Sequence, residues 1–388
     1  MRQPPAYSPL PWRALRESAR GVLRRESRDR VTLRTLLARE FSADAVGLFG
    51  SGTQALQIAL GDAACATGSD IVALPAFTCF DVASAAVGAG LRIVLYDVDP
   101  ATLSPDCDSL RAALAQGARM VVVTPLFGFP IDWEAVQACA VPHGAVLIED
   151  AAQGLGATWH GARLGTLGDR SVLSFGRGKG WTGGQGGALL TRRGARPPDL
   201  RNGKHLAADL RVLTLAAAQW AFGRPNLYGI PAALPWLGLG ETRYHDPTPP
   251  KALPHTAARL LLHAVAVSQR EIEARKIRAV RLLAKISGGS RLRPIKPLAG
   301  AQPGYLRLPV RVAGGVAGLA DPDRARRLGV ARSYPTPLSE VPAVRERLVA
   351  MGTGAWPGAE ELARDLVTLP THSLLSVLHL DQVARAVA

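Results

Sequence analysis

Residues 171–191 read SVLSFGRGKGWTGGQGGALLT, which is an apolar run, a glycine-rich loop with a single lysine, and a second apolar run. The segment 174–187 holds seven glycines, and Lys179 is the only lysine in the first 200 residues. We interpret SVLSF and GGALLT as two strands that flank the loop. A lysine between glycines at a strand end is well placed to approach a flat ligand, whereas most loop lysines are only solvated.

Short apolar runs alternate with helical patterns from Val46 up to this loop. The runs VGLF, IVALP, RIVLYDVD, RMVVV and AVLIE are separated by amphipathic stretches. Near-continuous apolar strands between helices are typical of a mostly parallel sheet that is covered on both faces. The sequence therefore predicts an α/β fold with a mostly parallel central sheet.

A second, smaller α/β domain is predicted after a region rich in proline and glycine. A long helical pattern covers residues 256–286 and is followed by the strand-like YLRLPVRV and a helix near residues 321–328. We place the boundary near residue 250. Residues 1–250 would form an N-terminal arm and the large domain, and residues 251–388 the long helix and the smaller domain.

The composition, with 47% hydrophobic and 20% charged residues, fits a globular chain. The N-terminus lacks the apolar core of a secretory signal. The four cysteines form no CxxC pair and show no metal-ligand spacing. We therefore expect a reduced, cytoplasmic protein without a metal site.

The formal net charge of +15 raises the question of a nucleic-acid partner. The chain has 40 arginines and 6 lysines, but they are dispersed and no DNA- or RNA-binding motif accompanies them. We therefore expect no nucleic-acid partner, and we expect the charge to attract an anionic small molecule.

The apolar segment 212–239 is interrupted by an arginine and three prolines, and no stretch of the chain reaches 18 uninterrupted apolar residues. A membrane-spanning helix is therefore not expected. We interpret the segment as a buried or interfacial lid, with a peripheral membrane contact as the alternative.

Two further stretches carry chemistry. In FGSGTQALQIAL (49–60), glycines allow a tight turn before a helix that starts near Thr53, and the N-terminus of such a helix suits a phosphate. In VLIEDAAQGLGA (146–157), Glu149 and Asp150 stand at the carboxyl end of a buried strand, where α/β sheets place ligand sites. Taken alone, each stretch is explained better by ordinary helix capping than by a ligand site.

The lysine loop is not a P-loop, because Leu173 and Gly180 stand where that motif needs Gly and Ser or Thr. A phosphate site, a strand-end carboxylate and a lysine together are what pyridoxal 5′-phosphate (PLP) requires. The lysine forms a Schiff base, the carboxylate keeps the pyridine nitrogen protonated, and the helix N-terminus holds the phosphate. We therefore expect PLP as the cofactor.

The order of the motifs resembles the DegT–StrS family of fold-type I, PLP-dependent sugar nucleotide aminotransferases. The motifs that carry the resemblance are SGTQAL, PAFTCFDVA, DVDPATLSPD, EDAAQGLGA, GTLGD, SFGRGK, GGQGGALLT and, nearer the C-terminus, SYPTPLSEVPA and LVTLPTHSLL. The resemblance implies a large domain with a mostly parallel sheet, a smaller C-terminal domain, and an aminotransferase activity.

The resemblance also implies roles for individual residues. Lys179 resembles the lysine that forms the Schiff base and moves the proton during transamination. Asp150 resembles the partner of the pyridine nitrogen, and Gln153 resembles the polar residue beside the cofactor ring.

The phosphate contacts implied in the same way are Ser174, through its hydroxyl, and Gly52 and Thr53 in the turn. The family works as a homodimer with two active sites at the subunit interface, so a homodimer is expected here.

Three positions depart from the family pattern. Cys79 stands where the family places an aromatic residue over the cofactor ring, with Phe77 and Phe80 as the nearest aromatic residues. Gln185 replaces a glutamate, and the asparagine that reaches the partner's phosphate is missing near residues 251–260. The substrate is therefore the least determined part of the prediction.

The leading hypothesis is a PLP-dependent aminotransferase that transfers an amino group from glutamate or glutamine to a keto-sugar nucleotide, in cell-surface polysaccharide or secondary-metabolite biosynthesis. One alternative is a PLP-dependent sugar dehydratase of the same family, in which histidine replaces the lysine. Another is a non-catalytic family member with a binding or regulatory role.

Overall fold

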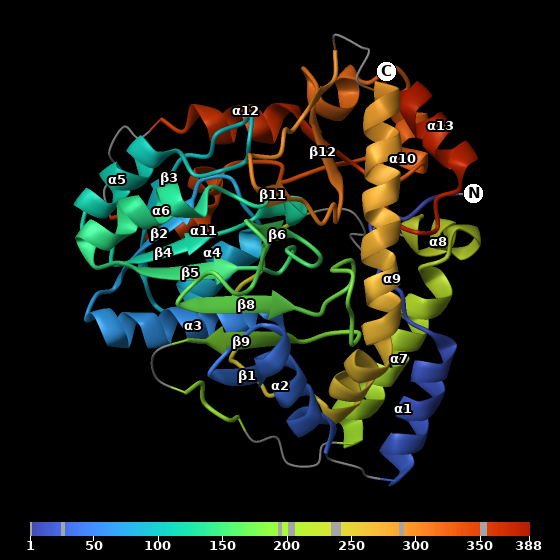
Figure 1. Ribbon diagram of the computed structural model, residues 1–388, viewed down its shortest axis with the longest axis horizontal. Coiled ribbons are helices and arrows are strands. Elements are labelled where there is room, and N and C mark those ends of the chain that lie inside the picture. Colours follow the sequence, from blue (N-terminus) through green and yellow to red (C-terminus); the bar gives the residue numbers. More distant parts are fainter. Residues whose placement is uncertain are drawn as a thin grey trace.

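The computed structural model describes residues 2–24, 28–192, 196–200, 206–233, 242–286, 291–349 and 355–388 (Figure 1). Its largest sheet has seven strands, namely β1 (Ala45–Phe49), β2 (Ile71–Pro75), β3 (Arg92–Tyr96), β4 (Met120–Val123), β5 (Val146–Asp150), β8 (Arg170–Ser174) and β9 (Gly187–Thr191). Their spatial order is β1-β9-β8-β5-β4-β2-β3.

The centre of this sheet is parallel, as the apolar runs predict. Strands β3, β2, β4, β5 and β8 pair in parallel, whereas β9 pairs with both β8 and β1 in the antiparallel sense. Ser174 at the end of β8 stands opposite Gly187 at the start of β9. The lysine loop between them therefore leaves the sheet at the carboxyl ends of the parallel strands, where ligand sites of α/β proteins lie.

Helices cover both faces of the sheet. On one face lie α3 (Gly52–Thr67) and α4 (Phe80–Gly88), whose apolar side chains share a core with Val172 of β8. On the other face lie α5 (Cys107–Ala115) and α6 (Trp133–Ala140). The neighbouring Leu173 belongs to a different core from Val172 because successive side chains of a strand point to opposite faces.

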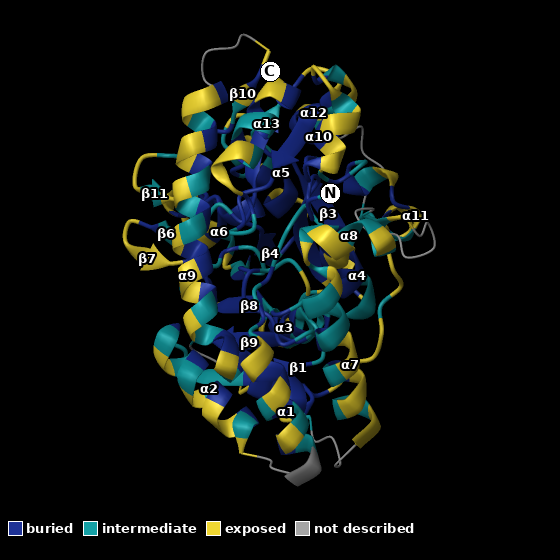
Figure 2. Cartoon of the chain, turned by 90° about the vertical axis from the view of Figure 1, so that its right-hand side faces the viewer, coloured by how far each residue is buried: buried dark blue, intermediate teal, exposed yellow. Residues whose placement is uncertain are grey.

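A second layer of helices is arranged around the long helix α9 (His255–Ile286), which contacts α1, α2 and α7 and also α13 (Figure 2). Figure 2 shows exposed residues along the outer surfaces of these helices and buried residues in the strands behind them. The other helices of the layer are α1 (Trp12–Arg24), α2 (Asp29–Glu40), α7 (Leu206–Phe222), α8 (Pro225–Ala232) and α13 (Val377–Val387).

The C-terminal region has its own antiparallel sheet in the order β10-β12-β14-β13. Its elements are β10 (Arg293–Pro294), β12 (Leu308–Arg311), β13 (Ala331–Arg332), β14 (Leu366–Leu369), α10 (Pro322–Arg327), α11 (Pro342–Arg345) and α12 (Pro357–Asp365). A small third sheet joins β6 (Thr158–Trp159) with β7 (Ala162–Arg163) and β11 (Ala301–Gln302). Short 3-10 turns occupy Leu126–Gly128, Val141–His143, Gly315–Gly318 and Leu338–Glu340. The boundary near residue 250 stays a prediction, since α9 packs against helices of both regions.

The apolar segment 212–239 forms most of α7 and all of α8, and its last part lies outside the described residues. Val212 and Ala216 are buried, whereas Phe222 and Ile230 are exposed. Among the described helices, none is long and apolar enough to cross a membrane. The lid and the membrane-surface interpretations both stay predictions.

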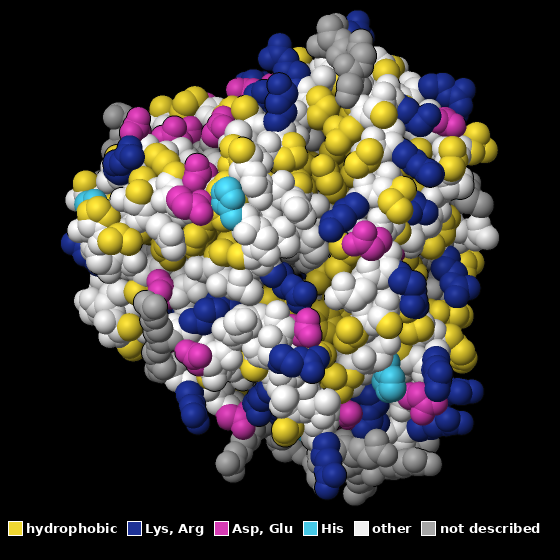
Figure 3. Space-filling model, in the orientation of Figure 1, with side chains coloured by type: hydrophobic (Ala, Val, Ile, Leu, Met, Phe, Trp, Pro, Cys, Tyr) yellow, Lys and Arg dark blue, Asp and Glu magenta, His cyan; other side chains and the backbone are white. Residues whose placement is uncertain are grey.

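The basic side chains are scattered over the face of the molecule that Figure 3 shows, and acidic side chains lie between them. This face has no continuous basic patch of the kind that nucleic-acid-binding proteins present.

Candidate active site

The predicted phosphate turn joins β1 to α3. Ser51 is the N-cap residue of α3, and its hydroxyl accepts a 3.1 Å hydrogen bond from the amide of Gln54. The amide of Gly50 donates to the carbonyl of Lys251 at 2.8 Å, which holds the turn in place. The first amides of α3 and the positive end of its dipole are thereby directed away from the sheet, as an anion site requires.

Ser174 stands directly against this turn. A Cβ atom on Gly52 would lie 2.8 Å from the Cβ and 3.0 Å from the Oγ of Ser174. A Cβ on Gly187 would lie 2.4 Å from the carbonyl oxygen of Ser51. Only glycine permits these approaches. The structure thus brings together the Ser174 hydroxyl, the Gly52 backbone and Thr53 in the first turn of α3, the three residues predicted to bind phosphate.

The two strand-end carboxylates have different environments, and Glu149 is the structural one. Its side chain is fully buried and accepts hydrogen bonds from the amides of Gly165 at 2.6 Å and Leu167 at 3.0 Å and from the hydroxyl of Ser171 at 2.9 Å. Burial raises the pKa of the Glu149 carboxyl, and these hydrogen bonds oppose the shift. Glu149 therefore organises the loop after β7 and takes no part in ligand binding.

Asp150 points to the opposite face of β5, toward the lysine loop. Its Oδ1 accepts a 3.1 Å hydrogen bond from the amide of Ala152, and the residue is half-buried. Burial raises the pKa of the Asp150 carboxyl, and the nearby Lys179 ammonium lowers it. A carboxylate in this position is stabilised by any further cationic group that approaches it.

Cys79 and Lys179 lie close to this carboxylate. Cys79 is the N-cap residue of α4. Burial raises the pKa of its thiol to about 12, with Asp81 and Asp150 adding to the shift and Lys179 opposing it. The thiol therefore stays neutral and protonated. The position that is aromatic in the family holds a small side chain within electrostatic reach of Lys179 and Asp150.

The ring of Tyr334, from the C-terminal region, lies near Cys79 and Asp150. The sequence analysis did not identify Tyr334 as a site residue. The ring of Tyr334 lies nearly parallel to that of Phe127, with centroids 6.3 Å apart, and meets the ring of Phe77 edge-on at 5.4 Å. Gln153 donates to the Tyr334 hydroxyl at 2.8 Å and accepts from the amide of Phe127 at 2.9 Å. Burial raises the pKa of Tyr334 well above its ordinary value, and Cys79 adds to the shift. The segment SYPTPLSEVPA contains Tyr334 and was the available signal.

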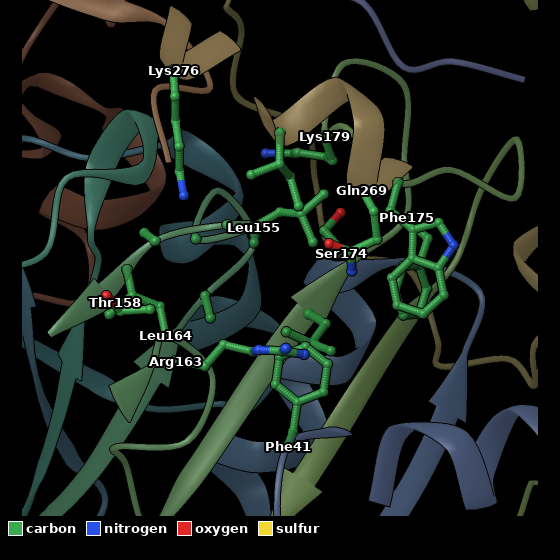
Figure 4. A pocket seen from close by; sticks show the side chains of 18 of the residues that line it. Phe41, Leu155, Thr158, Arg163, Leu164, Ser174, Phe175, Lys179, Gln269 and Lys276 are labelled. Atoms are coloured by element: carbon green, nitrogen blue, oxygen red, sulfur yellow. The ribbon is translucent and has the colours of Figure 1, made fainter. Parts of the chain in front are cut away.

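A second cavity, of about 170 Å³, adjoins Lys179 on the other side of its loop (Figure 4). Figure 4 shows Lys179, Ser174 and Leu155 around one part of it and Arg163 and Phe41 around another. The Arg163 guanidinium stands 5.4 Å from the centre of the Phe41 ring. The cavity shares Ser174 and Lys179 with the predicted cofactor site, whereas Asp150, Cys79 and Gly52 are not among its lining residues.

The residues on the first side of the lysine loop fit PLP in their chemistry. The glycine-lined approach of Gly52 to Ser174 forms a cradle for a phosphate, and the partly exposed Asp150 matches a protonated ring nitrogen. Lys179 supplies the amine between them. The structure places Gly52 against Ser174, and Cys79 and Asp150 within electrostatic reach of Lys179. Gln153 is joined to Tyr334 and Phe127. The binding and catalytic roles of the predicted residues Gly52, Thr53, Cys79, Asp150, Gln153, Ser174 and Lys179 stay predictions.

Comparison with known proteins shows which family this part of the chain resembles. Residues 35–201 match the model of the DegT/DnrJ/EryC1/StrS aminotransferase family. The match covers less than half of the chain, and over these residues the chain is similar to that family. The DegT/DnrJ/EryC1/StrS segment covers the phosphate turn, the strand-end carboxylates and the lysine loop.

One curated relative is the L-glutamine:2-deoxy-scyllo-inosose aminotransferase of Streptomyces kanamyceticus, 40% identical over 162 residues. The match covers 42% of this chain and 37% of the relative, so the chain spans less than two fifths of the length of that protein. The similarity therefore concerns the part of the large domain that carries the site.

Solved structures show that the whole chain has the fold of this family. The sugar aminotransferase CalS13 of Micromonospora echinospora superimposes with a TM-score of 0.76 at 20% identity, over 99% of this chain and 98% of that chain. The PLP-form of the sugar aminotransferase Spr1654 of Streptococcus pneumoniae superimposes with a TM-score of 0.72 at 19% identity, over 99% and 97%. The fold is thus the predicted fold-type I architecture.

Proposed function

We propose that this protein is a PLP-dependent aminotransferase. The observation that supports the proposal most directly is the placement of Lys179 beside the Asp150 carboxylate, with the cradle of Gly52 and Ser174 nearby. When bound, the cofactor supplies a protonated ring that withdraws electrons from the carbon next to the amino group. Several relatives of this chain are named as aminotransferases, while one, from Geobacillus stearothermophilus, is named as a pleiotropic regulatory protein.

Each of three residues of the chain would have its own role in the reaction. Lys179 would hold the aldehyde carbon covalently and then move a proton at the substrate carbon as a free amine. Asp150 would keep the ring nitrogen protonated, and the burial that raises its pKa is then offset by the positive ring. Gln153, fixed by Tyr334, would stand at the edge of the ring.

The neutral Cys79 thiol fills less space than an aromatic side chain would, so it would leave more room beside a bound cofactor. The Tyr334 and Phe127 rings form an apolar wall on the C-terminal side of the same region. We infer that these rings take over part of the contact that the family assigns to position 79. The small thiol and the wall together suit a ring-shaped acceptor.

We propose glutamine or glutamate as the amino donor and a keto-sugar nucleotide as the acceptor, in cell-surface polysaccharide or secondary-metabolite biosynthesis. The name of the Streptomyces relative gives L-glutamine as its donor and 2-deoxy-scyllo-inosose as its acceptor, which supports glutamine and calls for acceptors without a nucleotide in any test. Retention of Lys179 argues against the dehydratase alternative.

We also propose a homodimer. The carbonyl of Lys251 fixes the phosphate turn, while the Lys251 side chain is exposed beside it. A second chain approaching this edge would meet the phosphate turn directly. Sedimentation of the cofactor-loaded protein is expected to show a dimer, and a monomer at every concentration would refute this part of the proposal.

The catalytic proposal is tested by loading the purified chain with PLP and adding L-glutamine or L-glutamate. We expect the visible absorption of the bound cofactor to disappear with a productive donor and to return with an accepted ketone from a panel that includes keto-sugar nucleotides and 2-deoxy-scyllo-inosose. Lys179→Ala should abolish both changes. Lys276→Ala, which alters a lysine of the neighbouring cavity, is the matched control and should preserve them. A wild-type chain that loads with PLP but responds to no donor would support a non-catalytic role instead.

A further inference from the structure

The first residues of the chain are tied to the C-terminal region by buried contacts. We call residues 3–8 the N-terminal arm. The arm lies beside α10, and Figure 1 places the N-terminus near α8, α10 and α13. The amide of Gln3 donates to the carbonyl of Arg327 at 2.8 Å, and the carbonyl of Pro4 accepts from Nε2 of His372 at 2.8 Å.

Two buried arginines hold the next residues of the arm. The guanidinium of Arg307 donates to the carbonyl of Pro5 and also to the Oγ1 and carbonyl oxygen of Thr368, at 2.6 and 2.7 Å. The guanidinium of Arg275 donates from Nη2 to the carbonyl of Tyr7 at 2.6 Å. Four successive contacts along six residues therefore fix the path of the arm.

These arginines are unusual because charged side chains are seldom buried without a reason. Arg275 is completely buried in α9, and its Nε lies 3.4 Å from Oε1 of Glu271, which is also buried. Its Nη1 has no hydrogen-bond partner among the residues that the structure describes. A Cβ on Gly180 would lie 2.4 Å from this nitrogen, so the guanidinium touches the backbone next to Lys179.

The arm itself contacts the lysine loop on both sides of the lysine. The amide of Gly180 donates a buried 2.9 Å hydrogen bond to the hydroxyl of Ser8. On the other side, a Cβ on Gly178 would lie 3.4 Å from the Cβ of Ala6. Both glycines have positive φ, +83° and +89°. A loop of such residues has little conformational preference of its own, so its path depends on these outside contacts.

We infer that the N-terminal arm is a positioning element for Lys179, and that Ser8 is the residue through which it acts. The arm is held against the C-terminal region by its hydrogen bonds with Arg275, Arg307 and His372. The Ser8 hydroxyl extends this restraint to the amide of Gly180, which follows Lys179. The arm thereby couples the C-terminal region to the lysine loop. The chemical role of Lys179 in this inference rests on the proposed function, whereas the restraint on the loop does not.

The test compares three variants with the wild-type chain. Ser8→Ala removes the hydroxyl that accepts from Gly180, and Ser8→Thr keeps a hydroxyl there. Ser18→Ala is the matched control because Ser18 is fully buried near the N-terminus and its hydroxyl has no partner among the described residues. All four chains are first measured without cofactor, by hydrogen–deuterium exchange of peptides that cover residues 174–187.

Loss of one buried hydrogen bond is expected to speed exchange at the Gly180 amide about three- to tenfold in Ser8→Ala. Ser8→Thr and Ser18→Ala should exchange like the wild type. Equal exchange in Ser8→Ala and the wild type would overturn the inference, and so would equal acceleration in Ser18→Ala, since that would indicate general loosening of the chain.

A second measurement reports on Lys179 itself. With PLP added, Ser8→Ala should form the covalent Lys179 adduct more slowly and shift the pH midpoint of its visible absorption, while Ser8→Thr restores both. An unchanged rate and midpoint would overturn the link to Lys179. If the wild-type chain forms no adduct, the proposed function fails, and the exchange data still decide whether the arm restrains the loop.

Discussion

Gln153 donates a 2.8 Å hydrogen bond to the hydroxyl of Tyr334, which lies 181 residues further along the chain. This bond joins the segment that follows Asp150 in the large domain to the C-terminal region. The candidate site is therefore completed by two distant parts of the chain, and its geometry depends on both.

Removing the Tyr334 hydroxyl tests how much the stability of the chain depends on its hydrogen bond with Gln153. Tyr334→Phe leaves the half-buried Gln153 amide without this partner, so we expect the free energy of unfolding to fall by about 0.5–1.5 kcal/mol. Urea denaturation measures the change. Tyr244→Phe is the control, because the Tyr244 hydroxyl is buried without a hydrogen-bond partner in the described structure. A loss as large in Tyr244→Phe would contradict the assignment.

Because the phosphate turn lies against Ser174, we expect alanine substitutions at two glycines of α3 to have very different effects on PLP affinity. Gly52→Ala places a methyl group 2.8 Å from the Cβ of Ser174 and should weaken PLP binding more than about tenfold, because the cradle must open. Gly61→Ala meets nothing within 4 Å and should stabilise the helix by about 0.5–1 kcal/mol with unchanged affinity. Fluorescence titration with PLP measures both. Equal affinities in the two variants would show that the cradle does not bind the phosphate.

The two neighbouring carboxylates should respond differently to neutralisation. Glu149→Gln replaces a carboxylate that accepts from Gly165, Leu167 and Ser171 and should lower the free energy of unfolding by about 2–4 kcal/mol. Asp150→Asn removes a half-buried carboxylate with one backbone partner and should leave the stability of the cofactor-free chain nearly unchanged at low pH. Thermal melting of both variants measures the contrast, which similar losses would contradict.

The raised pKa of Asp150 predicts a pH dependence of that stability. The folded chain holds the Asp150 proton more tightly than the unfolded chain, whose carboxyl titrates near 3.8. Between this value and the raised one, the folded state carries more bound protons, so the contribution of Asp150 to the free energy of unfolding falls as pH rises. As pH rises through this window, the wild type should lose free energy of unfolding relative to Asp150→Asn. The variant should therefore become the more stable of the two by a growing margin. A constant difference would show that the carboxyl is not perturbed.

The buried ion pair in α9 should be sensitive to the loss of one partner. Arg275→Met leaves Glu271 buried without its ion-pair partner and should cost about 3–5 kcal/mol. Adding Glu271→Leu should recover only part of this loss, because the bonds to the Tyr7 carbonyl and from the Ser373 amide stay absent. The exposed pair of Arg111 and Asp108 is the control, and Arg111→Met should cost less than about 1 kcal/mol. Urea denaturation separates the cases. A double variant as unstable as the single one would argue against the pairing.

Much of the large domain could be predicted from local sequence. The apolar runs identified β5, β8 and β9 because strands that are buried on both faces of a sheet need continuous apolar residues, whatever their direction. The phosphate turn, Asp150 and Lys179 could be identified because each depends on a short motif.

Contacts between distant segments could not be predicted in this way. Nothing in the pair Glu149 and Asp150 says which carboxylate faces the loop amides, because that depends on the direction of each side chain in the folded strand. Tyr334 and the N-terminal arm reach the site only through the packing of the C-terminal region. The motif SYPTPLSEVPA marks the segment that contains Tyr334, but local sequence does not show how this segment or the arm packs against the site.

Peptide mapping after borohydride treatment of the PLP-loaded protein tests the central claim most directly. The account predicts a single reduced cofactor adduct, located on Lys179 in the peptide that contains SFGRGKG, and its loss in Lys179→Ala while Lys276→Ala keeps it. An adduct on another lysine, or none in the wild-type chain, would contradict it.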